Sequence, residues 1–499
     1  NPMRGSVAVF ALVGGLSAAL AASNSQTHQW LCEEGGCGTW AADPSDMLGA
    51  ADHQAHTLAS TPAPRTYIVQ FNGYMEHNLL EERVSEAVRN ATASSGSLRV
   101  VHRSNPGARL PTDFLLLEWI PRLDADDPTV ARLEAELFAM LHAAPDVKRV
   151  TEDKVVLPDV ASRRLMQHLR GSDRDEEPLP PRVDAAGRRL TWAQRGVTET
   201  FHAQELWDAG HTGQGIRIAI FDTGLKQGHP MFRNVKERTN WTSEKTLEDG
   251  IGHGSFVAGV IASTSDCKGF APDAELYIFR VFTNAQASFT SWFLDAFNYA
   301  LHRRVHVLNL SIGGPDFNDM PFVEKVWEMT SNGVIFVSAL GNDGPLYGTL
   351  MNPADQPDVI GVGGITDGGD MAPFSSRGMT TWELPFGYGR VKPDVVTYAE
   401  NLRGARSEGG CRTLSGTSVA SPVIAGAVAL LASSIPADRR QLVMTPAALK
   451  QVLLEGAERL PRPHVYEQGA GRLNLLQSWR LLREYAPRPS LHPPVLDLT

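Results

Sequence analysis

Three polar residues in this sequence are of the types that together perform nucleophilic catalysis. Asp222 directly follows an apolar run, His253 stands between two glycines, and Ser418 stands just ahead of a long apolar stretch. A serine hydroxyl needs a base to take its proton before it can attack a carbonyl carbon. Histidine is such a base near neutral pH, and a buried carboxylate fixes its tautomer and stabilises the imidazolium. We therefore interpret Ser418 as nucleophile, His253 as general base and Asp222 as the orienting acid of an acyl transfer.

Asn342 is the residue whose chemistry completes this set. It lies in the segment 339–345, Ala-Leu-Gly-Asn-Asp-Gly-Pro, at the end of another apolar run. Its amide can donate a hydrogen bond to a developing oxyanion beside the backbone N–H of Ser418. Each of Asp222, His253 and Ser418 alone is more typical of a turn, a helix cap or a packed polar group. Only the combination indicates catalysis.

Five short apolar runs must supply the strands that position these side chains. They are 216–221, 276–281, 305–310, 334–340 and 359–362. Helical patterns lie between several of them, which predicts an α/β domain with a parallel sheet and helices on both faces. In an open sheet of this kind, side chains at the carboxyl ends of the strands form the site. Asp222 and Asn342 both follow such ends.

The N-terminal part of the chain has a different character. Arg4 followed by the apolar run 7–20 and small residues indicates a secretory signal peptide over 1–22, with a membrane anchor as the alternative. Residues 23–64 form a polar linker. No later apolar run approaches the ~20 residues of a spanning helix, so we expect a protein of the secretory-pathway lumen or a secreted one, without a further transmembrane segment.

Residues 65–157 show the alternation of strand and helix patterns expected of a small α+β domain. The predicted strands are 67–71, 98–102, 114–119 and 147–156, and the predicted helices are 79–88 and 130–141. The order β-α-β-β-α-β is ferredoxin-like. Residues 158–191 are charged and Pro-rich, which indicates an exposed linker. The catalytic domain is expected over 192–485 and a tail over 486–499.

Composition excludes some partners and scaffolds. The chain has 46 Lys and Arg against 56 Asp and Glu, a formal charge of −10, which argues against nucleic acid as a partner. Four cysteines are too few for a disulfide scaffold, and the pairing of Cys267 and Cys411 is left open. The sequons at Asn90 and Asn240 are candidate glycan acceptors, whereas Asn309 falls in a predicted buried strand.

The order Asp, His, Ser and the segment 416–422, Gly-Thr-Ser-Val-Ala-Ser-Pro, resemble the subtilisin-like serine proteases. The resemblance implies a protease without a cofactor in its chemistry, and the roles given above for Asp222, His253, Asn342 and Ser418. Substrate binding is implied for the edge segment Ser311, Ile312, Gly313 and Gly314. It also implies that 65–157 is an inhibitory propeptide and folding aid. A structural calcium ion is common in the family, but its ligands are unknown here.

Three further stretches, 234–242, 269–276 and 374–385, resemble the site-1 protease subfamily. This implies cleavage of selected protein precursors, membrane-anchored ones included, after a non-basic residue in Arg-X-aliphatic-X motifs. The linker holds two such motifs, so we expect self-cleavage after Thr191 and after Met166. Their residues are Arg188, Leu190 and Thr191, and Arg163, Leu165 and Met166. The alternatives are a broad-specificity subtilisin, or a catalytically silent binding protein with this fold.

Overall fold

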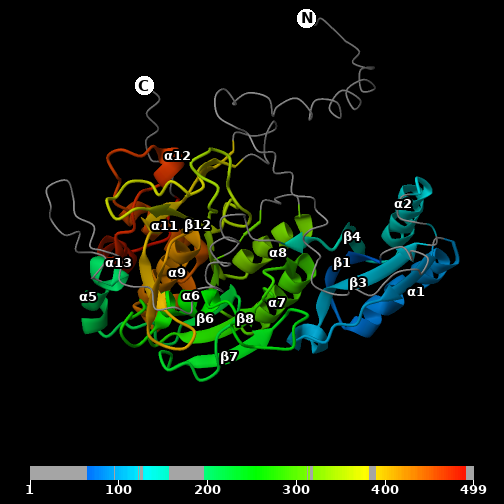
Figure 1. The fold of residues 1–499 in the computed structure, drawn as a ribbon, viewed down its shortest axis with the longest axis horizontal. Helices are drawn as coiled ribbons and strands as arrows, with labels where there is room; N and C mark the ends of the chain where they lie inside the picture. The colour runs from blue at the N-terminus through cyan, green and yellow to red at the C-terminus, as the bar shows by residue number, and fades with distance from the viewer. Residues whose placement is uncertain are drawn as a thin grey trace, which may run out of the picture. The chain divides into compact units, whose positions relative to one another are not determined.

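The computed structural model describes residues 64–94, 96–121, 123, 127–156, 196–311, 313–314, 319–380 and 389–489. They contain an N-terminal α+β domain and a larger α/β domain (Figure 1). Both domains follow the order of elements expected from the sequence.

A parallel sheet of seven strands, counted within the described residues, forms the centre of the α/β domain. Its strand order is β15-β12-β11-β10-β6-β8-β7. The bounds are β6 (Arg217–Asp222), β7 (Val235–Asn240), β8 (Glu275–Arg280), β10 (Val307–Leu310), β11 (Ile335–Ala339), β12 (Ile360–Ile365) and β15 (Val395–Tyr398). The register is continuous across the middle of the sheet, where Leu310 pairs with Phe221 on one side and Ser338 on the other. Strands buried on both faces explain the near-continuous apolar runs.

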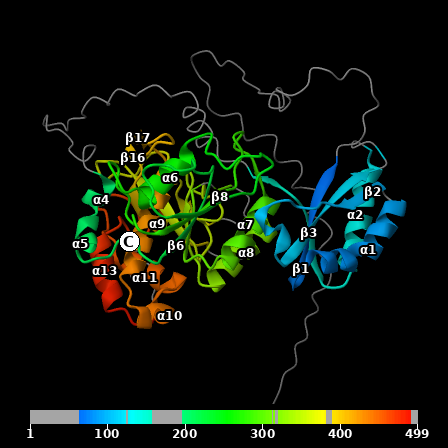
Figure 2. The same cartoon turned by 90° about the horizontal axis from the view of Figure 1, so that it is seen from below.

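Helices cover both faces of this sheet. Helix α6 (His253–Ala262) connects β7 to β8, and α7 (Thr290–His302) and α8 (Met320–Ser331) connect β8 to β10 and β10 to β11. All three connections run across the sheet in the same direction. Helices α7 and α8 lie side by side in both views (Figure 2), whereas α6 packs against α9 (Thr417–Ser433) on the other face. The crossover through α6 therefore has the opposite hand to the crossovers through α7 and α8, an exception to the uniform hand that parallel connections usually have.

Helix α9 is the most buried element of the fold. All its residues from Thr417 to Ser433 are buried, and it packs against β10, β11, β12 and β15. A Cβ at Gly426 would come within 3.3 Å of the Cα of Ile261 in α6, so glycine is needed for this close approach. The small residues of α9 thus let the two helices pack tightly over the sheet.

The N-terminal domain has the ferredoxin-like arrangement. Its elements are β1 (Arg65–Met75), α1 (His77–Ser94), β2 (Gly96–Val100), β3 (Thr112–Pro121), α2 (Thr129–His142) and β4 (Val147–Glu152). Within the described residues the sheet has four antiparallel strands in the order β2-β3-β1-β4. Its core contains Tyr67, Leu117, Trp119 and Leu137, so the domain has an apolar interior of its own.

The smaller elements occupy the connections and the C-terminal part. They are η2 (Pro106–Arg109), β5 (Val155–Val156), α4 (Val197–Thr200), α5 (Ala203–Asp208), β9 (Ser288–Phe289), β13 (Gly378–Met379), β14 (Val391–Lys392), β16 (Leu402–Ala405), β17 (Cys411–Leu414), η4 (Ala437–Arg439), α10 (Arg440–Val443), α11 (Pro446–Gly456), α12 (Val465–Gln468) and α13 (Leu475–Arg483). Helix α11 begins as its Thr-Pro start predicts, because the Thr445 hydroxyl accepts from the Ala448 N–H at 3.2 Å.

The structure confirms the five predicted core strands and adds β7 and β15 to the sheet. The last predicted strand of the N-terminal domain is wrong in part. The predicted strand 147–156 divides into β4, which closes the four-stranded sheet, and β5, which pairs with β9 of the α/β domain instead. The division falls at Asp153 and Lys154, whose side-chain carboxylate and backbone carbonyl bond to the start of α7.

A disulfide joins Cys267 and Cys411, with 6.0 Å between their Cα atoms. It connects the segment after α6 to β17, and the two cysteines are 144 positions apart in the sequence. Cross-links that close long loops stabilise a fold mainly by restricting the unfolded chain. The pairing that the sequence left open is thereby settled.

Within the described residues, no single helix combines the length and apolar character needed to cross a membrane. Thr417–Ser433 and Ala437–Val443 meet the criterion only when taken together, and the chain bends by 111° between them.

Candidate active site

Three elements bring Asp222, His253 and Ser418 to one edge of the sheet. Asp222 is the last residue of β6, His253 the first residue of α6, and Ser418 the second residue of α9. Both helices begin at the carboxyl edge and pack together at Ile261 and Gly426. Each contact residue lies eight positions beyond the functional residue, about 12 Å along a helix. The N-terminal ends of α6 and α9 are therefore neighbours.

His253 and Asp222 form a fully buried pair. The imidazole Nδ1 lies 2.8 Å from the Asp222 Oδ1, and both side chains have an exposed fraction of 0%. A carboxylate only accepts hydrogen bonds, so Nδ1 carries the proton and Nε2 is left as the basic nitrogen. Burial lowers the pKa of His253, but the Asp222 carboxylate, with a further contribution from Asp249, raises it, and the net pKa lies above its ordinary value.

The two atoms that the predicted mechanism uses are buried and form no hydrogen bonds with the described residues. Among the described residues, neither His253 Nε2 nor Ser418 Oγ has a hydrogen-bond partner. Buried polar atoms are normally paired, and exceptions concentrate where a substrate or a reaction uses them. Ser418 is also in the first turn of α9, where the backbone N–H has no acceptor within the helix. That N–H can serve an oxyanion.

Asn342 is held next to Ser418 by its own side-chain oxygen. Oδ1 accepts from the backbone N–H of Thr417 at 2.8 Å and from the Thr417 hydroxyl at 3.1 Å. These two donors fix the orientation of the amide, because an N–H group cannot donate to the amide nitrogen. The Nδ2 group therefore turns away from Thr417. The oxyanion role of Asn342 stays a prediction, and this orientation of the amide agrees with it.

The segment interpreted as substrate-binding lies against a strand from the N-terminal domain. Ser311 is buried, Gly313 packs closely on the Asn352 carbonyl, and Gly314 exchanges two backbone hydrogen bonds with Asn352 at 3.1 and 2.8 Å. A Cβ at Gly314 would lie 3.8 Å from Val156 Cγ1. The backbone of Val156 pairs with Ser288 of β9. The two-residue strand β5 therefore pairs with β9, and its Val156 side chain lies next to Gly314.

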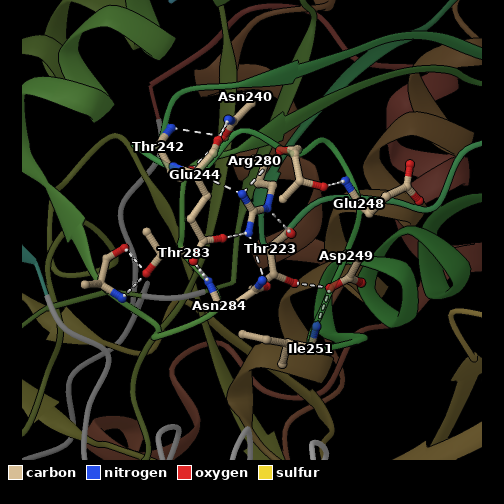
Figure 3. A network of polar contacts seen from close by, with 12 residues as sticks. Thr223, Asn240, Thr242, Glu244, Glu248, Asp249, Ile251, Arg280, Thr283 and Asn284 are labelled. Carbon is tan, nitrogen blue, oxygen red and sulfur yellow. Dashed lines mark hydrogen bonds and ion pairs between the residues drawn. The ribbon is translucent and has the colours of Figure 1, made fainter. Parts of the chain in front are cut away.

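A buried arginine ties the surrounding loops to β6. Arg280, the last residue of β8, is 1% exposed. Its Nε donates to the Thr223 carbonyl at 3.2 Å, and its guanidinium also contacts Glu244, Thr242 and Asn284 (Figure 3). Thr223 directly follows Asp222, so this network fixes the backbone at the Asp222 carboxylate.

The other predicted residues fall into two groups. Ile312 and the cleavage-motif residues Arg163, Leu165, Met166, Arg188, Leu190 and Thr191 lie outside the described residues. Asn90 is exposed on α1. Asn240 ends β7, where its Oδ1 accepts from the Thr242 N–H and hydroxyl and its Nδ2 contacts the Glu244 carbonyl. Asn309 is fully buried in β10.

The calcium ion expected from the resemblance stays an expectation. Within the described residues, no group of three or more His, Cys, Asp or Glu side chains forms a candidate metal site. We therefore assign no calcium ligands.

Comparison with known proteins now identifies the class. Residues 213–471 match the family model of the Subtilase family, and the chain belongs to that family. It is a subtilisin-like serine protease. Residues 63–154 match the Membrane-bound Site-1 Protease Family N-terminal domain. The N-terminal α+β domain and the larger α/β domain thus each match a family model of their own.

Individual relatives show which members of the family this chain resembles most strongly among those compared. The human membrane-bound transcription factor site-1 protease is 50% identical over 462 residues, which cover 89% of this chain and 42% of the relative. The Subtilisin-like protease SBT6.1 of Arabidopsis thaliana is 50% identical over 447 residues, covering 86% of this chain and 42% of the relative. Subtilisin E of Bacillus subtilis is 31% identical over 241 residues, covering 47% and 60% respectively. The chain spans about two fifths of the length of the first two relatives.

Sequence reasoning missed several residues around the site. Val155 and Val156 were assigned to the end of the predicted strand 147–156 of the N-terminal domain. Arg280 was assigned to the predicted buried strand 276–281, with no role at the site. Asp249 stands four residues before His253 in a Gly-rich segment, which was the available signal for a capping carboxylate.

We predict that Asn342→Ala and Asn342→Asp both lower kcat by about 10²–10³-fold with little change in KM, because each removes an oxyanion donor that acts in the transition state. Asn342→Asp keeps an oxygen facing Thr417, so it should unfold at a temperature near that of the wild type. Steady-state kinetics and thermal unfolding check both statements. Near wild-type kcat in the aspartate variant would contradict the role.

We predict that kcat/KM rises with pH through an apparent pKa above 6.5. Protonated His253 cannot accept the Ser418 proton, and its pKa is raised, so activity is lost as the pH falls through that raised value. Asp222→Asn should move this limb to lower pH and reduce kcat by about 10⁴-fold. A pH profile of both proteins is the measurement. A wild-type limb below pH 6 would show that another group controls it.

Proposed function

We propose that the chain is the zymogen form of a secretory-pathway endopeptidase that cuts selected protein precursors after a non-basic residue in Arg-X-aliphatic-X motifs. In this proposal residues 65–157 are its inhibitory propeptide. The observation that carries the proposal is the antiparallel pairing of Val155–Val156 with Ser288–Phe289, beside Gly314.

The strand 155–156 is bound in the way a peptide substrate would be. Main-chain pairing with a sheet edge gives affinity that depends little on side chains. The attachment continues upstream, where Lys154 O accepts from Thr290 N at 3.0 Å and the Asp153 carboxylate accepts from the Ser291 N–H and hydroxyl at 2.9 and 2.7 Å. A chain segment held there excludes another extended peptide from the same edge, which is the basis of the inhibition we propose.

Buried polar contacts hold the N-terminal domain on α7 and α8. Arg103 lies 2.7 Å from Asp295, with side chains 6% and 4% exposed, and Asn105 donates to the other Asp295 oxygen at 2.5 Å. Lys325 of α8, almost fully buried, lies 2.7 Å from Asp113. Such pairs are costly to break by removing one partner, since the other charge stays buried. The interface therefore favours a specific, retained domain.

The cleavage specificity rests on sequence motifs and similarity. The linker motifs ending at Thr191 and Met166 have Arg at the fourth position back and Leu at the second. The printed name of the mammalian relatives refers to a membrane-bound transcription factor, and membrane-anchored precursors are a substrate class we propose for this chain. The competing proposals remain a broad-specificity subtilisin and a silent binding protein.

The disulfide and the N-terminal apolar segment support the compartment. Disulfides persist in the oxidising secretory pathway and are rare in the cytosol. We place the protein in the endoplasmic reticulum or Golgi lumen and propose glycans at Asn90 and Asn240, together with a structural calcium ion by family resemblance.

We predict that expressed wild-type protein acquires a new N-terminus at Trp192, whereas Ser418→Ala does not, because the cut requires the protein's own nucleophile. N-terminal sequencing of both proteins is the measurement. The same new end in both would assign the cut to another protease.

A panel of peptides with and without Arg at the fourth position before the cut separates selective from broad cleavage. If an active-site phosphonate failed to label the processed protein, the silent binding protein would be favoured.

We predict that Arg103→Ala releases the N-terminal domain after processing, because Asp295 is left with a buried, uncompensated charge, a cost of about 3–5 kcal/mol. Lys148→Ala is the matched control, since it removes a more exposed ion pair to Glu324, worth about 0–1 kcal/mol. Co-elution of the two parts in gel filtration is measured on the full, processed chain. Equal retention in both variants would show that the Arg103 pair does not hold the domain.

A further inference from the structure

We propose that Asp249 is a positioning residue for His253. Its carboxylate holds the loop and the first turn of α6 that present the imidazole between Asp222 and Ser418. The proposal rests on the serine-protease chemistry of the family and is independent of the cleavage specificity proposed above.

The Asp249 carboxylate accepts five hydrogen bonds while only 8% exposed. Oδ1 accepts from Ile251 N at 3.2 Å and Gly252 N at 2.8 Å, and Oδ2 accepts from the Ser255 N–H and hydroxyl at 2.8 and 2.7 Å. The fifth donor, at 2.7 Å, is the Thr223 hydroxyl. Backbone donors on both sides of His253 thus converge on one carboxylate.

A carboxylate is suited to this place because the N-terminus of a helix carries unpaired N–H groups and a partial positive charge. The capping residue Gly252 has no side chain to satisfy them, and it has φ +88°. A Cβ there would also lie 2.9 Å from Ser407 Oγ. Glycine is therefore required at the cap, and Asp249 supplies the acceptors from three residues upstream.

Thr223 links this cap to the catalytic carboxylate. Its hydroxyl donates to Asp249 (Figure 3). The same hydroxyl accepts from the Gly254 N–H at 2.9 Å, while the Thr223 N–H donates to Asp222 Oδ1 at 2.8 Å. The same Asp222 oxygen bonds to His253. Asp249 therefore contacts both the strand that carries the acid and the helix that carries the base.

The charge of Asp249 also acts on the imidazole. The charged groups that face His253 are Asp222 from β6, Asp249 from the preceding loop and Arg412 from β17. Burial lowers the pKa of His253, the two carboxylates raise it, and Arg412 lowers it. Removal of the Asp249 charge should therefore shift the titration of His253 to lower pH, which a purely structural cap would not do.

The test compares Asp249→Asn with Glu248→Gln in the full chain. Glu248 is the adjacent carboxylate, half-exposed and paired with Arg238, so its variant controls for loss of one negative charge. Thermolysin, a metalloprotease that the phosphonate probe does not label, cuts the linker in every variant. The rate of labelling of Ser418 by a fluorophosphonate is then measured from pH 5 to 9, normalised to the final labelled fraction.

For Asp249→Asn we expect a plateau rate about 10–100-fold lower and an acid midpoint shifted to lower pH, with Glu248→Gln near wild type. An acid midpoint equal to that of Glu248→Gln would overturn the proposal. If Asp249→Asn does not fold, Ser255→Ala and Ser255→Thr decide, because only threonine keeps the hydroxyl that donates to Asp249. Slower labelling in Ser255→Ala alone supports the proposal, and equal rates in all three proteins overturn it. Labelling reads Ser418 directly, so an incorrect cleavage motif would not affect the comparison.

Discussion

An imidazole with no exposed surface can act as a base only when a neighbouring charge stabilises its protonated form. That constraint governs this site, because burial alone would lower the pKa of His253 and leave no stabilised imidazolium during the reaction. Asp222 supplies the charge at 2.8 Å. The remaining structure around the site can be understood as the means of keeping these two buried groups in contact while leaving Nε2 available.

The parallel sheet meets this requirement through its chain directions. Strands β6 and β11 end at the same edge, and helices α6 and α9 begin there, so an acid, a base, an amide and a nucleophile converge without long loops. Close packing makes the arrangement rigid. Gly426 allows α9 to approach α6, and Gly254, where a Cβ would meet the Gly224 carbonyl at 2.3 Å, allows α6 to approach the end of β6.

Motifs and apolar runs predicted the chemistry and the central strands, but not the full environment. Asp222, His253 and Ser418 were recognisable because each stands in a specific short segment. Strand β7 was missed because Lys236, Glu237 and Arg238 give a sheet edge no apolar run, and β15 has only four residues after a proline. Contacts such as Asp249 to Thr223 and Val156 to Ser288 join segments far apart in sequence, so no local pattern indicates them.

The disulfide also changes how far apart the catalytic residues are along the chain. His253 and Ser418 are separated by 165 residues, yet Cys267 follows His253 by only 14 and Cys411 precedes Ser418 by only 7. Once the bond has formed, the shortest covalent path between base and nucleophile is about an eighth as long. The entropic cost of closing a loop grows with the logarithm of its length. A path shortened about eightfold, which is three successive halvings, reduces the cost of bringing His253 and Ser418 together by roughly 2 kcal/mol. An oxidising environment would thus favour assembly of the catalytic pair itself, while Asn342 and the substrate edge fold inside the closed loop.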